Sequence, residues 1–383
     1  MGTPTHSSKS LTAVLLIGVV AFIAGCCPPR RAVPETLLSQ THYAGMVDVR
    51  TDYLHYNPQI GESLTASGEC SFLAISGGGA FGAGVLCGWS QTGTRPQFQV
   101  VTGVSTGALL APFAFLGPDY DDRIKEAYTT VGNRDIFMYR GPVGIVRLFL
   151  RESYVETRPL RRMIARMFTE TELAAVAAQH RAGRRLYVGT TNLDANQFVI
   201  WNMGAIAVSD HPEALDMFRK ILLTSASIPG VFPPVYFDVE VEGEKYNEMH
   251  VDGGVIAGVF GYGPRLFETL REPGVTPDKP CTMYVIMNSK LDTSYEQTNP
   301  RFLRIAGRSF SSLMKRKAWS DLGEIYHQAN ADGVDFRYVA IPQHYQMSKK
   351  PGFDKNEMNK LFDLGFEMAA PETMWDTSVR IGP

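Results

Sequence analysis

A serine between two glycines and an aspartate before two glycines are the residues of this chain best suited to chemistry. Ser105 lies in Gly-Val-Ser-Thr-Gly (residues 103–107), and Asp252 precedes two glycines at 253–254. A serine hydroxyl becomes a nucleophile when a neighbouring base takes its proton. Upstream, three consecutive glycines offer backbone amides that could stabilise an oxyanion: Gly77, Gly78 and Gly79. These parts together indicate acyl transfer through an acyl-serine intermediate.

The segments around these residues read as strands that lead into helices. Residues 71–76 are apolar and run into the glycines, and a helix of small residues is expected from 80 to about 89. Residues 98–104 predict a second strand that ends at Ser105, followed by a helix over 106–116. A strand, sharp turn and helix around the serine is the context that a nucleophile elbow requires. Helix N-termini would also favour negative charge at both places.

The rest of the chain alternates strands and helices, which predicts an α/β fold with a mostly parallel sheet covered on both faces. In such sheets, sites form beyond the carboxyl ends of the strands, where the glycines and Ser105 fall. Further strands are expected at 185–191, 197–202, 236–241, 245–251, 281–288 and 336–341, and further helices within 121–183 and at 212–225, 301–330 and 355–374.

Two residues are candidates for the base. Asp252 ends an apolar strand, from which its carboxylate could reach Ser105, although Asp-Gly-Gly is also an ordinary turn sequence. His250 lies two residues earlier, so strand alternation would place it on the same face, and it remains an alternative base. The glycine run also fits Gly-x-Gly-x-x-Gly of dinucleotide sites, but no acidic residue ends the next strand at the required spacing.

Composition and charge exclude some functions. The chain has 383 residues, of which 44% are apolar and 20% charged, and a net charge of −2. This is globular composition without the basic surface that nucleic-acid binding needs. We expect no cofactor and no metal site, and an acidic cluster is read as a solvated loop: Asp119, Asp121 and Asp122. Cys70, Cys87 and Cys281 have no metal spacing and are read as buried thiols, with no disulfide assigned.

The N-terminus predicts export and a lipid anchor. Lys9 precedes an apolar run at 11–24 that has the length of a signal-peptide core. Ile-Ala-Gly-Cys (23–26) resembles a bacterial lipobox, so cleavage after residue 25 would leave Cys26 lipidated and attached to a membrane. The next residue is Cys27 rather than aspartate; by resemblance to Gram-negative lipoproteins, this favours the outer membrane of a bacterial envelope, facing the periplasm, over the inner membrane. We expect residues 26–44 to be a tether and residues 45–383 to be the globular domain.

The order of these motifs resembles the patatin-like phospholipases. The lipobox, together with residues 76–84 and Trp89, looks most like their bacterial lipoprotein branch. Two further stretches carry the likeness, Ala-Ser-Ile-Pro (226–229) with Phe-Pro-Pro (232–234), and residues 187–194; in all it spans about 70–290. The resemblance implies a three-layer α/β/α sandwich and metal-independent hydrolysis of lipid esters by a Ser-Asp dyad. In that dyad Ser105 is the nucleophile and Asp252 the base. The glycines at 77–79 would then form the oxyanion hole.

One departure and two alternatives accompany the resemblance. Phe81 stands where many family members carry Arg or Lys, which makes ester hydrolysis a firmer expectation than phospholipid specificity. Arg134, Arg140 or Arg151 could supply the missing charge. The alternatives are an acyltransferase that uses the same acyl-enzyme, and a binding lipoprotein that no longer catalyses.

Two segments have a less definite prediction. Residues 130–160 are the candidate lid over Ser105. The helix at 301–330 combines apolar side chains with six Lys or Arg residues. It could face a membrane or pack its apolar stripe on the sheet, and the apolar residues in question are Phe302, Phe310, Leu313, Met314 and Trp319.

Overall fold

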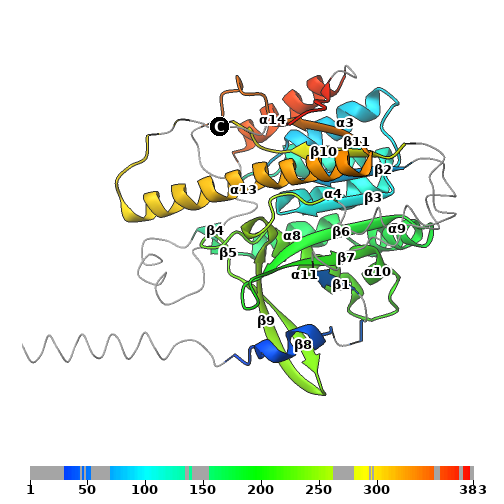
Figure 1. The fold of residues 1–383 in the computed structure, drawn as a ribbon, viewed down its shortest axis with the longest axis vertical. Helices are drawn as coiled ribbons and strands as arrows, with labels where there is room; N and C mark the ends of the chain where they lie inside the picture. The colour runs from blue at the N-terminus through cyan, green and yellow to red at the C-terminus, as the bar shows by residue number, and fades with distance from the viewer. Residues whose placement is uncertain are drawn as a thin grey trace, which may run out of the picture.

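The protein is built around one large mixed sheet (Figure 1). The computed structural model describes residues 30–43, 45–46, 49–52, 70–133, 138–139, 155–261, 280–292, 295, 297–348, 354–370 and 374–379. Five central strands are parallel, in the order β6, β3, β2, β10 and β11. Their bounds are β6 (Arg185–Asn192), β3 (Val100–Val104), β2 (Ser71–Ile75), β10 (Thr282–Met287) and β11 (Asp335–Ala340).

Antiparallel strands extend the sheet beyond β6. β7 (Gln197–Asn202) pairs with β6, and β1 (Arg50–Asp52) pairs with β7 at the edge. β9 (Glu244–Asp252) and β8 (Val235–Val241) form a hairpin. The end of β9 joins β6, with Thr190 opposite Asp252. This pairing brings Asp252 next to the carboxyl end of the parallel strands. A separate pair is β4 (Met138–Tyr139) with β5 (Val155–Glu156).

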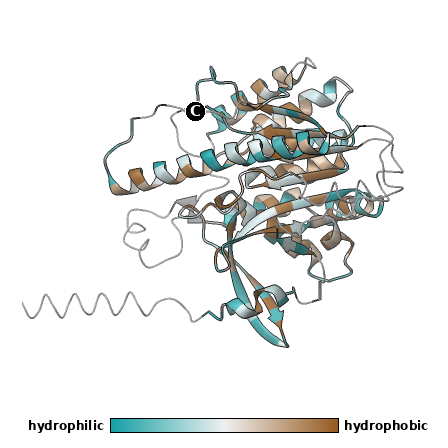
Figure 2. Ribbon diagram, viewed as in Figure 1, coloured by the Kyte–Doolittle hydropathy of each residue, from teal (hydrophilic) through white to brown (hydrophobic). Residues whose placement is uncertain are grey.

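Helices lie on both faces of the sheet, and the two faces are covered unequally. The larger core lies under α3, α4, α5, α8, α9, α10, α11 and α14, and the smaller one under α13 and residues 253–260. The bounds on the first face are α3 (Phe81–Gln91), α4 (Thr106–Leu116), α5 (Asp121–Thr129), α8 (Arg158–Met167), α9 (Glu170–Arg181), α10 (Met203–Val208), α11 (Ala214–Ser225) and α14 (Lys355–Ala369); on the second face is α13 (Phe302–Asp332). Figure 2 shows brown, apolar residues concentrated on the strands and helices between these layers.

The predicted mostly parallel α/β fold with helices on both sides is confirmed. The helix after Ser105 has the expected bounds, and each predicted strand is present within a few residues. Within the described residues, no helix is both long enough and apolar enough to cross a membrane.

The segment at 30–43 belongs to the globular body, although the sequence suggested a tether. Val33 is buried. The backbone amide of Asn247, which lies on the β8–β9 hairpin, donates a hydrogen bond to the carbonyl of Arg31. Arg30 pairs with Asp194. A short 3₁₀ turn, η1 (Glu35–Gln40), follows. Long-range pairing with a hairpin some two hundred residues away leaves no local sequence signal. Residues 1–29, with the predicted signal peptide and Cys26, lie outside the described residues.

Two of the three scattered cysteines are paired. Cys70 and Cys281 form a disulfide, with their Cα atoms 4.4 Å apart, whereas Cys87 is a buried free thiol. The prediction of a buried thiol is therefore confirmed for Cys87, and it is wrong for Cys70 and Cys281. The disulfide joins two positions just before β2 and β10, which are neighbouring parallel strands. The pairing of these cysteines could not be predicted from their spacing, because it depends on β2 and β10 being neighbours in the sheet.

Candidate active site

Ser105 sits on a strained turn between β3 and α4. Its backbone has φ 57° and ψ −132°, a positive-φ conformation that residues other than glycine rarely adopt. Such a conformation costs about 1–3 kcal/mol and persists where the surrounding structure holds it. α4 begins at the next residue, so its N-terminal end lies at Ser105. The predicted nucleophile elbow therefore has the expected backbone.

The flanking glycines are required by close backbone approach. A Cβ atom on Gly103 would lie 2.7 Å from the carbonyl oxygen of Gly107. A Cβ atom on Gly107 would lie 2.5 Å from the carbonyl oxygen of Ser76. Both distances are too short for non-bonded atoms. The two glycines let α4 leave the turn against the ends of β2 and β3.

Ser105 and Asp252 contact each other directly. The Ser105 Oγ donates a hydrogen bond of 2.7 Å to Asp252 Oδ2. The other carboxylate oxygen, Oδ1, accepts from the amide of Gly254 at 2.7 Å. Asp252 thus caps the Asp-Gly-Gly turn and reaches the serine at the same time. A Cβ atom on Gly253 would lie 2.5 Å from the carbonyl of Gly189, which explains the glycine after the aspartate.

Burial prepares the Asp252 carboxylate to accept a proton. The side chain is fully buried. Burial raises its pKa to about 7, against the opposing effect of the hydrogen bonds from Ser105 and Gly254. An aspartate with an ordinary pKa of about 3.9 is a weak base, and a raised pKa makes proton transfer from a hydroxyl less unfavourable.

Ser225 supports the backbone of Ser105, a role that was not predicted from the sequence. Its hydroxyl accepts a hydrogen bond of 3.0 Å from the amide of Ser105 and donates one of 2.7 Å to the carbonyl of Gly189. Ser225 is buried at the end of α11. It therefore ties the strained turn to the end of β6. The only sequence signal is its position just before the Ala-Ser-Ile-Pro stretch.

The glycine loop is fixed by Asn288, which follows β10. The backbone amide of Asn288 donates to the Ser76 hydroxyl, and the side-chain Nδ2 of Asn288 donates to the Ser76 carbonyl, both at 2.9 Å. Its Oδ1 accepts from the amide of Gly82 at 2.7 Å. Gly78, with φ 149°, passes so close that a Cβ atom there would lie 2.3 Å from that of Asn288. The apolar run at 281–288 predicts a strand that includes this asparagine and gives no sign of its role.

The glycine run lies beside the nucleophile. A Cβ atom on Gly77 would lie 2.6 Å from the Cβ of Ser105 and 3.1 Å from its Oγ. The amide of Gly78 donates to the Thr106 hydroxyl at 2.7 Å. Within the described part of the chain, the amides of Gly77 and Gly79 have no hydrogen-bond acceptor. Donors with no partner next to a serine oxygen are what oxyanion binding needs.

Phe81 has a packing role. It is fully buried in the larger core, at the start of α3. α14 packs closely on this turn, because a Cβ atom on Gly365 would lie 2.2 Å from the Phe81 carbonyl. The three arginines proposed as substitutes, at 134, 140 and 151, lie outside the described residues. So does most of the candidate lid at 130–160.

His250 is engaged elsewhere and does not touch Ser105. Its Nε2 lies 3.2 Å from Glu248 Oε2, and its Nδ1 lies 3.0 Å from the Thr190 hydroxyl. Burial lowers the pKa of His250. The neutral ring carries one proton, and because the Glu248 carboxylate can only accept, that proton is assigned to Nε2. Nδ1 then accepts from the Thr190 hydroxyl, which itself accepts from Trp201 Nε1. Both ring nitrogens of His250 are engaged away from Ser105, whereas Asp252 contacts Ser105 directly, so the geometry favours Asp252 over the alternative of a His250 base.

Glu248 and Arg50 complete this buried network. Arg50 donates to both carboxylate oxygens of Glu248, at 2.5 and 3.2 Å. Burial acts to raise the pKa of Glu248, but the hydrogen bond to His250 and the charge of Arg50 outweigh it and lower the pKa to about 2. This network ties the edge strand β1 to β9, the strand that ends at Asp252.

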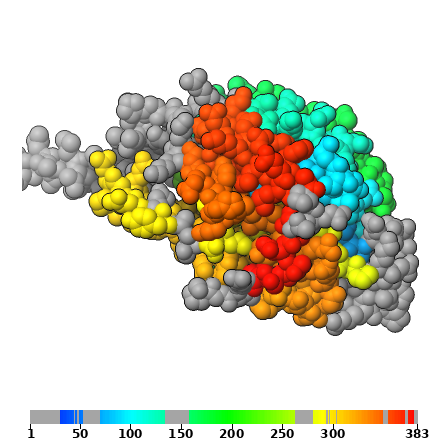
Figure 3. Space-filling view, turned by 90° about the horizontal axis from the view of Figure 1, so that it is seen from above, coloured from blue at the N-terminus to red at the C-terminus, as the bar shows by residue number. Residues whose placement is uncertain are grey.

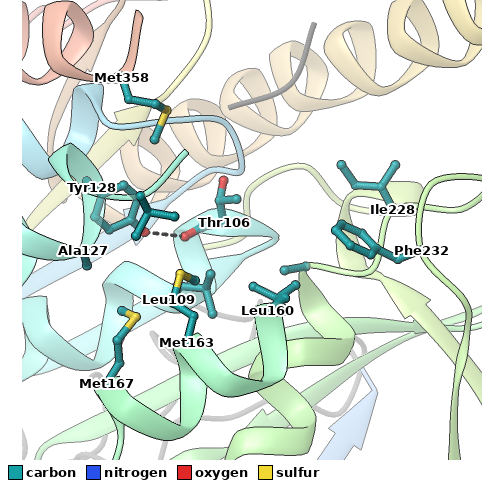
Figure 4. A pocket seen from close by; sticks show the side chains of 12 residues that line it. Thr106, Leu109, Ala127, Tyr128, Leu160, Met163, Met167, Ile228, Phe232 and Met358 are labelled. Carbon is teal, nitrogen blue, oxygen red and sulfur yellow. Dashed lines mark hydrogen bonds between the residues drawn. The ribbon is translucent and has the colours of Figure 1, made fainter. Parts of the chain in front are cut away.

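An apolar pocket opens next to the nucleophile (Figure 4). It encloses about 550 Å³, part of it open to solvent. Thr106 brings the pocket next to Ser105, and its carbonyl accepts from the Tyr128 hydroxyl at 2.8 Å. The other lining residues are Leu109, Ala127, Val131, Leu160, Met163, Met167, Ala226, Ile228, Phe232 and Met358.

The acidic cluster has a structural use. Asp121 pairs with Arg95, whose guanidinium is buried, at 2.9 Å. Across the residues that the structure describes, no three His, Cys, Asp or Glu side chains are grouped to hold a metal ion.

Comparison with known proteins gives one family match and distant structural similarities. No curated protein matches the chain significantly. Among solved structures, VipD from Legionella pneumophila is 11% identical with a TM-score of 0.33, over 82% of this chain and 68% of VipD. The type III effector protein ExoU is 12% identical with a TM-score of 0.31, over 79% of this chain and 52% of ExoU. The family model described as patatin-like phospholipase matches residues 73–260, which hold the glycine loop, Ser105 and Asp252. The chain therefore contains a patatin-like phospholipase domain.

Proposed function

We propose that the protein is a lipid acyl hydrolase that uses Ser105 and Asp252 as a catalytic dyad. The observation that carries the proposal is the 2.7 Å hydrogen bond between Ser105 Oγ and the fully buried carboxylate of Asp252. The match to the patatin-like phospholipase family over the same residues supports lipid ester hydrolysis.

In the first step, Ser105 Oγ attacks the acyl carbonyl carbon while its proton passes to Asp252 Oδ2. The negative charge on the carbonyl oxygen is stabilised by the amides of Gly77 and Gly79, which have no acceptor in the described part of the chain. The Gly78 amide could add a third donor if the Thr106 hydroxyl moves from it. The leaving alcohol takes the proton from Asp252. Water, deprotonated by Asp252, then attacks the acyl-serine carbonyl. The fatty acid leaves as the bond to Ser105 Oγ breaks, and Asp252 returns the proton to Ser105 Oγ.

The apolar pocket is the site we assign to the acyl chain. It begins at Thr106, directly after the nucleophile, and apart from the Tyr128 hydroxyl and Thr106 its lining side chains are hydrocarbon or thioether. Three methionines, Met163, Met167 and Met358, line it. Because methionine side chains are flexible and polarizable, they adapt to chains of different shape. Burial of methylene groups contributes about 0.8 kcal/mol each, which favours lipid esters over short ones.

We also propose that Cys26 carries a lipid anchor that attaches the protein to the bacterial envelope. The proposal rests on the lipobox-like Ile-Ala-Gly-Cys and the preceding apolar run. The Cys70–Cys281 disulfide supports an oxidising compartment, since such bonds are rare in the reducing cytosol. Metabolic labelling with a fatty-acid analogue, compared between wild type and Cys26→Ser, tests it. Equal labelling of the two would refute the anchor.

An ester panel tests the hydrolase proposal. The protein and its Ser105→Ala variant are assayed on short nitrophenyl esters, lysolipids, diacyl phospholipids and neutral glycerides. We expect turnover by the wild type alone, with longer chains preferred. An acyltransferase would instead form a new ester when an acceptor alcohol is added. No turnover of any ester, with a correctly folded protein, would favour the non-catalytic alternative.

A further inference from the structure

We propose that the first half of α13, residues 301–317, is a docking surface for an anionic lipid bilayer that sets the active site at the membrane. The inference deepens the proposed function, since it concerns how that site meets a lipid substrate. We call these residues the α13 tip.

The α13 tip exposes large apolar side chains. Phe302 is 81% exposed, Leu313 69% and Ile305 49%. Phe302 and Leu313 are eleven residues apart, about three helical turns, and so share one face. Exposed aromatic and aliphatic residues along one helix face mark an interaction surface when they are contiguous.

The face that packs on the sheet is a different one. In the second half of α13 the buried residues recur every three or four positions: Ala318, Leu322, Ile325 and Ala329. Leu313 lies five residues before Ala318, or about 1.4 turns, so it points away from the packed side. The apolar stripe expected to pack on the sheet therefore belongs to the second half of the helix only. Figure 1 shows the first half extending beyond the sheet, and Figure 3 shows the yellow segment that includes it standing out from the body.

The charge of the α13 tip is entirely positive. Residues 297–320 contain six Lys or Arg and no Asp or Glu. Burial is the main cause that lowers the pKa of Lys315; Lys290 and Arg308 add to it, and Asp292 opposes it. Apolar side chains beside cations are complementary to a bilayer with acidic headgroups, since the first enter the acyl region and the second meet phosphates. This complementarity favours a lipid surface over a purely apolar protein partner.

The α13 tip also adjoins the catalytic residues. A Cβ atom on Gly254 would lie 2.7 Å from the Cε of Met314, so this methionine covers the turn that positions Asp252. Leu313 is the next residue before it and points outward. A bilayer that takes up Leu313 would thus lie beside the turn that carries Asp252, and lipid would reach the site from that side.

A local fluorescence measurement tests the docking. The full chain, with Cys26 and Cys27 replaced by serine, receives an environment-sensitive nitrobenzoxadiazole label on Leu313→Cys. A matched control carries the label on Ala331→Cys, an exposed position at the other end of the same helix. We expect vesicles containing phosphatidylglycerol to shift the emission to the blue at position 313 and not at 331. No shift at 313, or an equal shift at both positions, would overturn the proposal.

Kinetics separate this proposal from the proposed function. We compare Phe302→Ser/Leu313→Ser with the apolar control Phe302→Leu/Leu313→Met. The substrates are a soluble short-chain nitrophenyl ester and a long-chain nitrophenyl ester dispersed in the same vesicles. The serine variant should lose at least about tenfold on the vesicle-borne ester, the factor expected from losing one buried side chain. It should keep its activity on the soluble ester. Full activity of the serine variant on vesicles would contradict docking. Absence of any wild-type turnover would refute the hydrolase and leave the fluorescence result to decide the docking.

Discussion

Ser105 Oγ donates a 2.7 Å hydrogen bond to Asp252 Oδ2, although 147 residues separate the two in the chain. The contact depends on the pairing of β9 with β6, which places Asp252 opposite Thr190 at the carboxyl end of the parallel strands. Ser105 is held on the neighbouring strand β3, which pairs with β6 on its other side. Three strand ends therefore bring nucleophile and base together.

The pH dependence of turnover should report the Asp252 carboxylate. Burial raises its pKa to about 7, and the base must be ionised to accept the serine proton. We expect kcat/KM for a soluble ester to fall about tenfold per pH unit below that pKa and to level off above it. A pH–rate profile from pH 5 to 9 measures this. A flat profile across pH 7 would mean that another group is the base.

The variant Asp252→Asn should lose activity and gain stability at high pH. Removal of a general base costs about 100- to 10,000-fold in kcat. Since the folded pKa is raised above the unfolded value of about 3.9, Asp252 favours folding fully only below pH 4. That contribution is lost as pH rises through about 7, where the buried side chain ionises. The asparagine, which cannot ionise, should therefore have the higher unfolding temperature at pH 8.

At pH 8 the free energy of unfolding of Asp252→Asn should exceed that of the wild type by a few kcal/mol at most, since one pKa unit corresponds to about 1.4 kcal/mol. Thermal unfolding of both proteins at pH 4 and pH 8 checks the sign. A stability difference that does not grow with pH would contradict the raised pKa.

Ser225→Ala should impair catalysis without removing a reacting group. The amide of Ser105 and the carbonyl of Gly189 would both lose their partner. An unsatisfied buried polar group costs about 1–3 kcal/mol in stability. Loss of alignment at the nucleophile should lower kcat by about 10- to 100-fold. The substitution Ser227→Ala is the control, because within the described residues that hydroxyl bonds only to the Leu223 carbonyl. Equal kcat in both variants would show that Ser225 does not position Ser105.

His250→Gln should weaken the fold and leave the chemistry intact. The histidine connects Thr190 to Glu248 in the buried network and does not contact Ser105. We expect a loss of about 1–3 kcal/mol in the free energy of unfolding. The kcat and the pH profile should remain close to wild type. If the variant folds but loses turnover as fully as Asp252→Asn does, His250 takes part in catalysis after all.

The parts of the site that lie in short local motifs could be predicted from the sequence. Ser105, Asp252 and the glycines follow strands whose apolar runs are plain, and α4 has the predicted bounds. Ser225, Thr106 and Asn288 could not be predicted, because each is a single polar residue in ordinary sequence. Asn288 acts on Ser76 across 212 positions, so its role appears only once β2 and β10 are paired.

Two other differences between the predicted and the observed structure also arise because long-range packing leaves no local signal in the sequence. The apolar residues of α13 predict a stripe, but periodicity alone does not say which stripe the sheet covers; packing buries Leu322 and leaves Phe302 exposed. Likewise, the segment at 30–43 follows two prolines and begins with two arginines, as a linker often does, yet its backbone pairs with the distant β8–β9 hairpin.

Covalent labelling by a fluorophosphonate tests the dyad most directly. The wild type, Ser105→Ala and Asp252→Asn are each incubated with the probe, and the modified peptide is identified by mass spectrometry. We predict labelling at Ser105 in the wild type, at a rate that falls below pH 7, with none in Ser105→Ala and far slower labelling in Asp252→Asn. Labelling at another residue, or an unchanged rate in Asp252→Asn, would contradict a Ser105 nucleophile activated by Asp252.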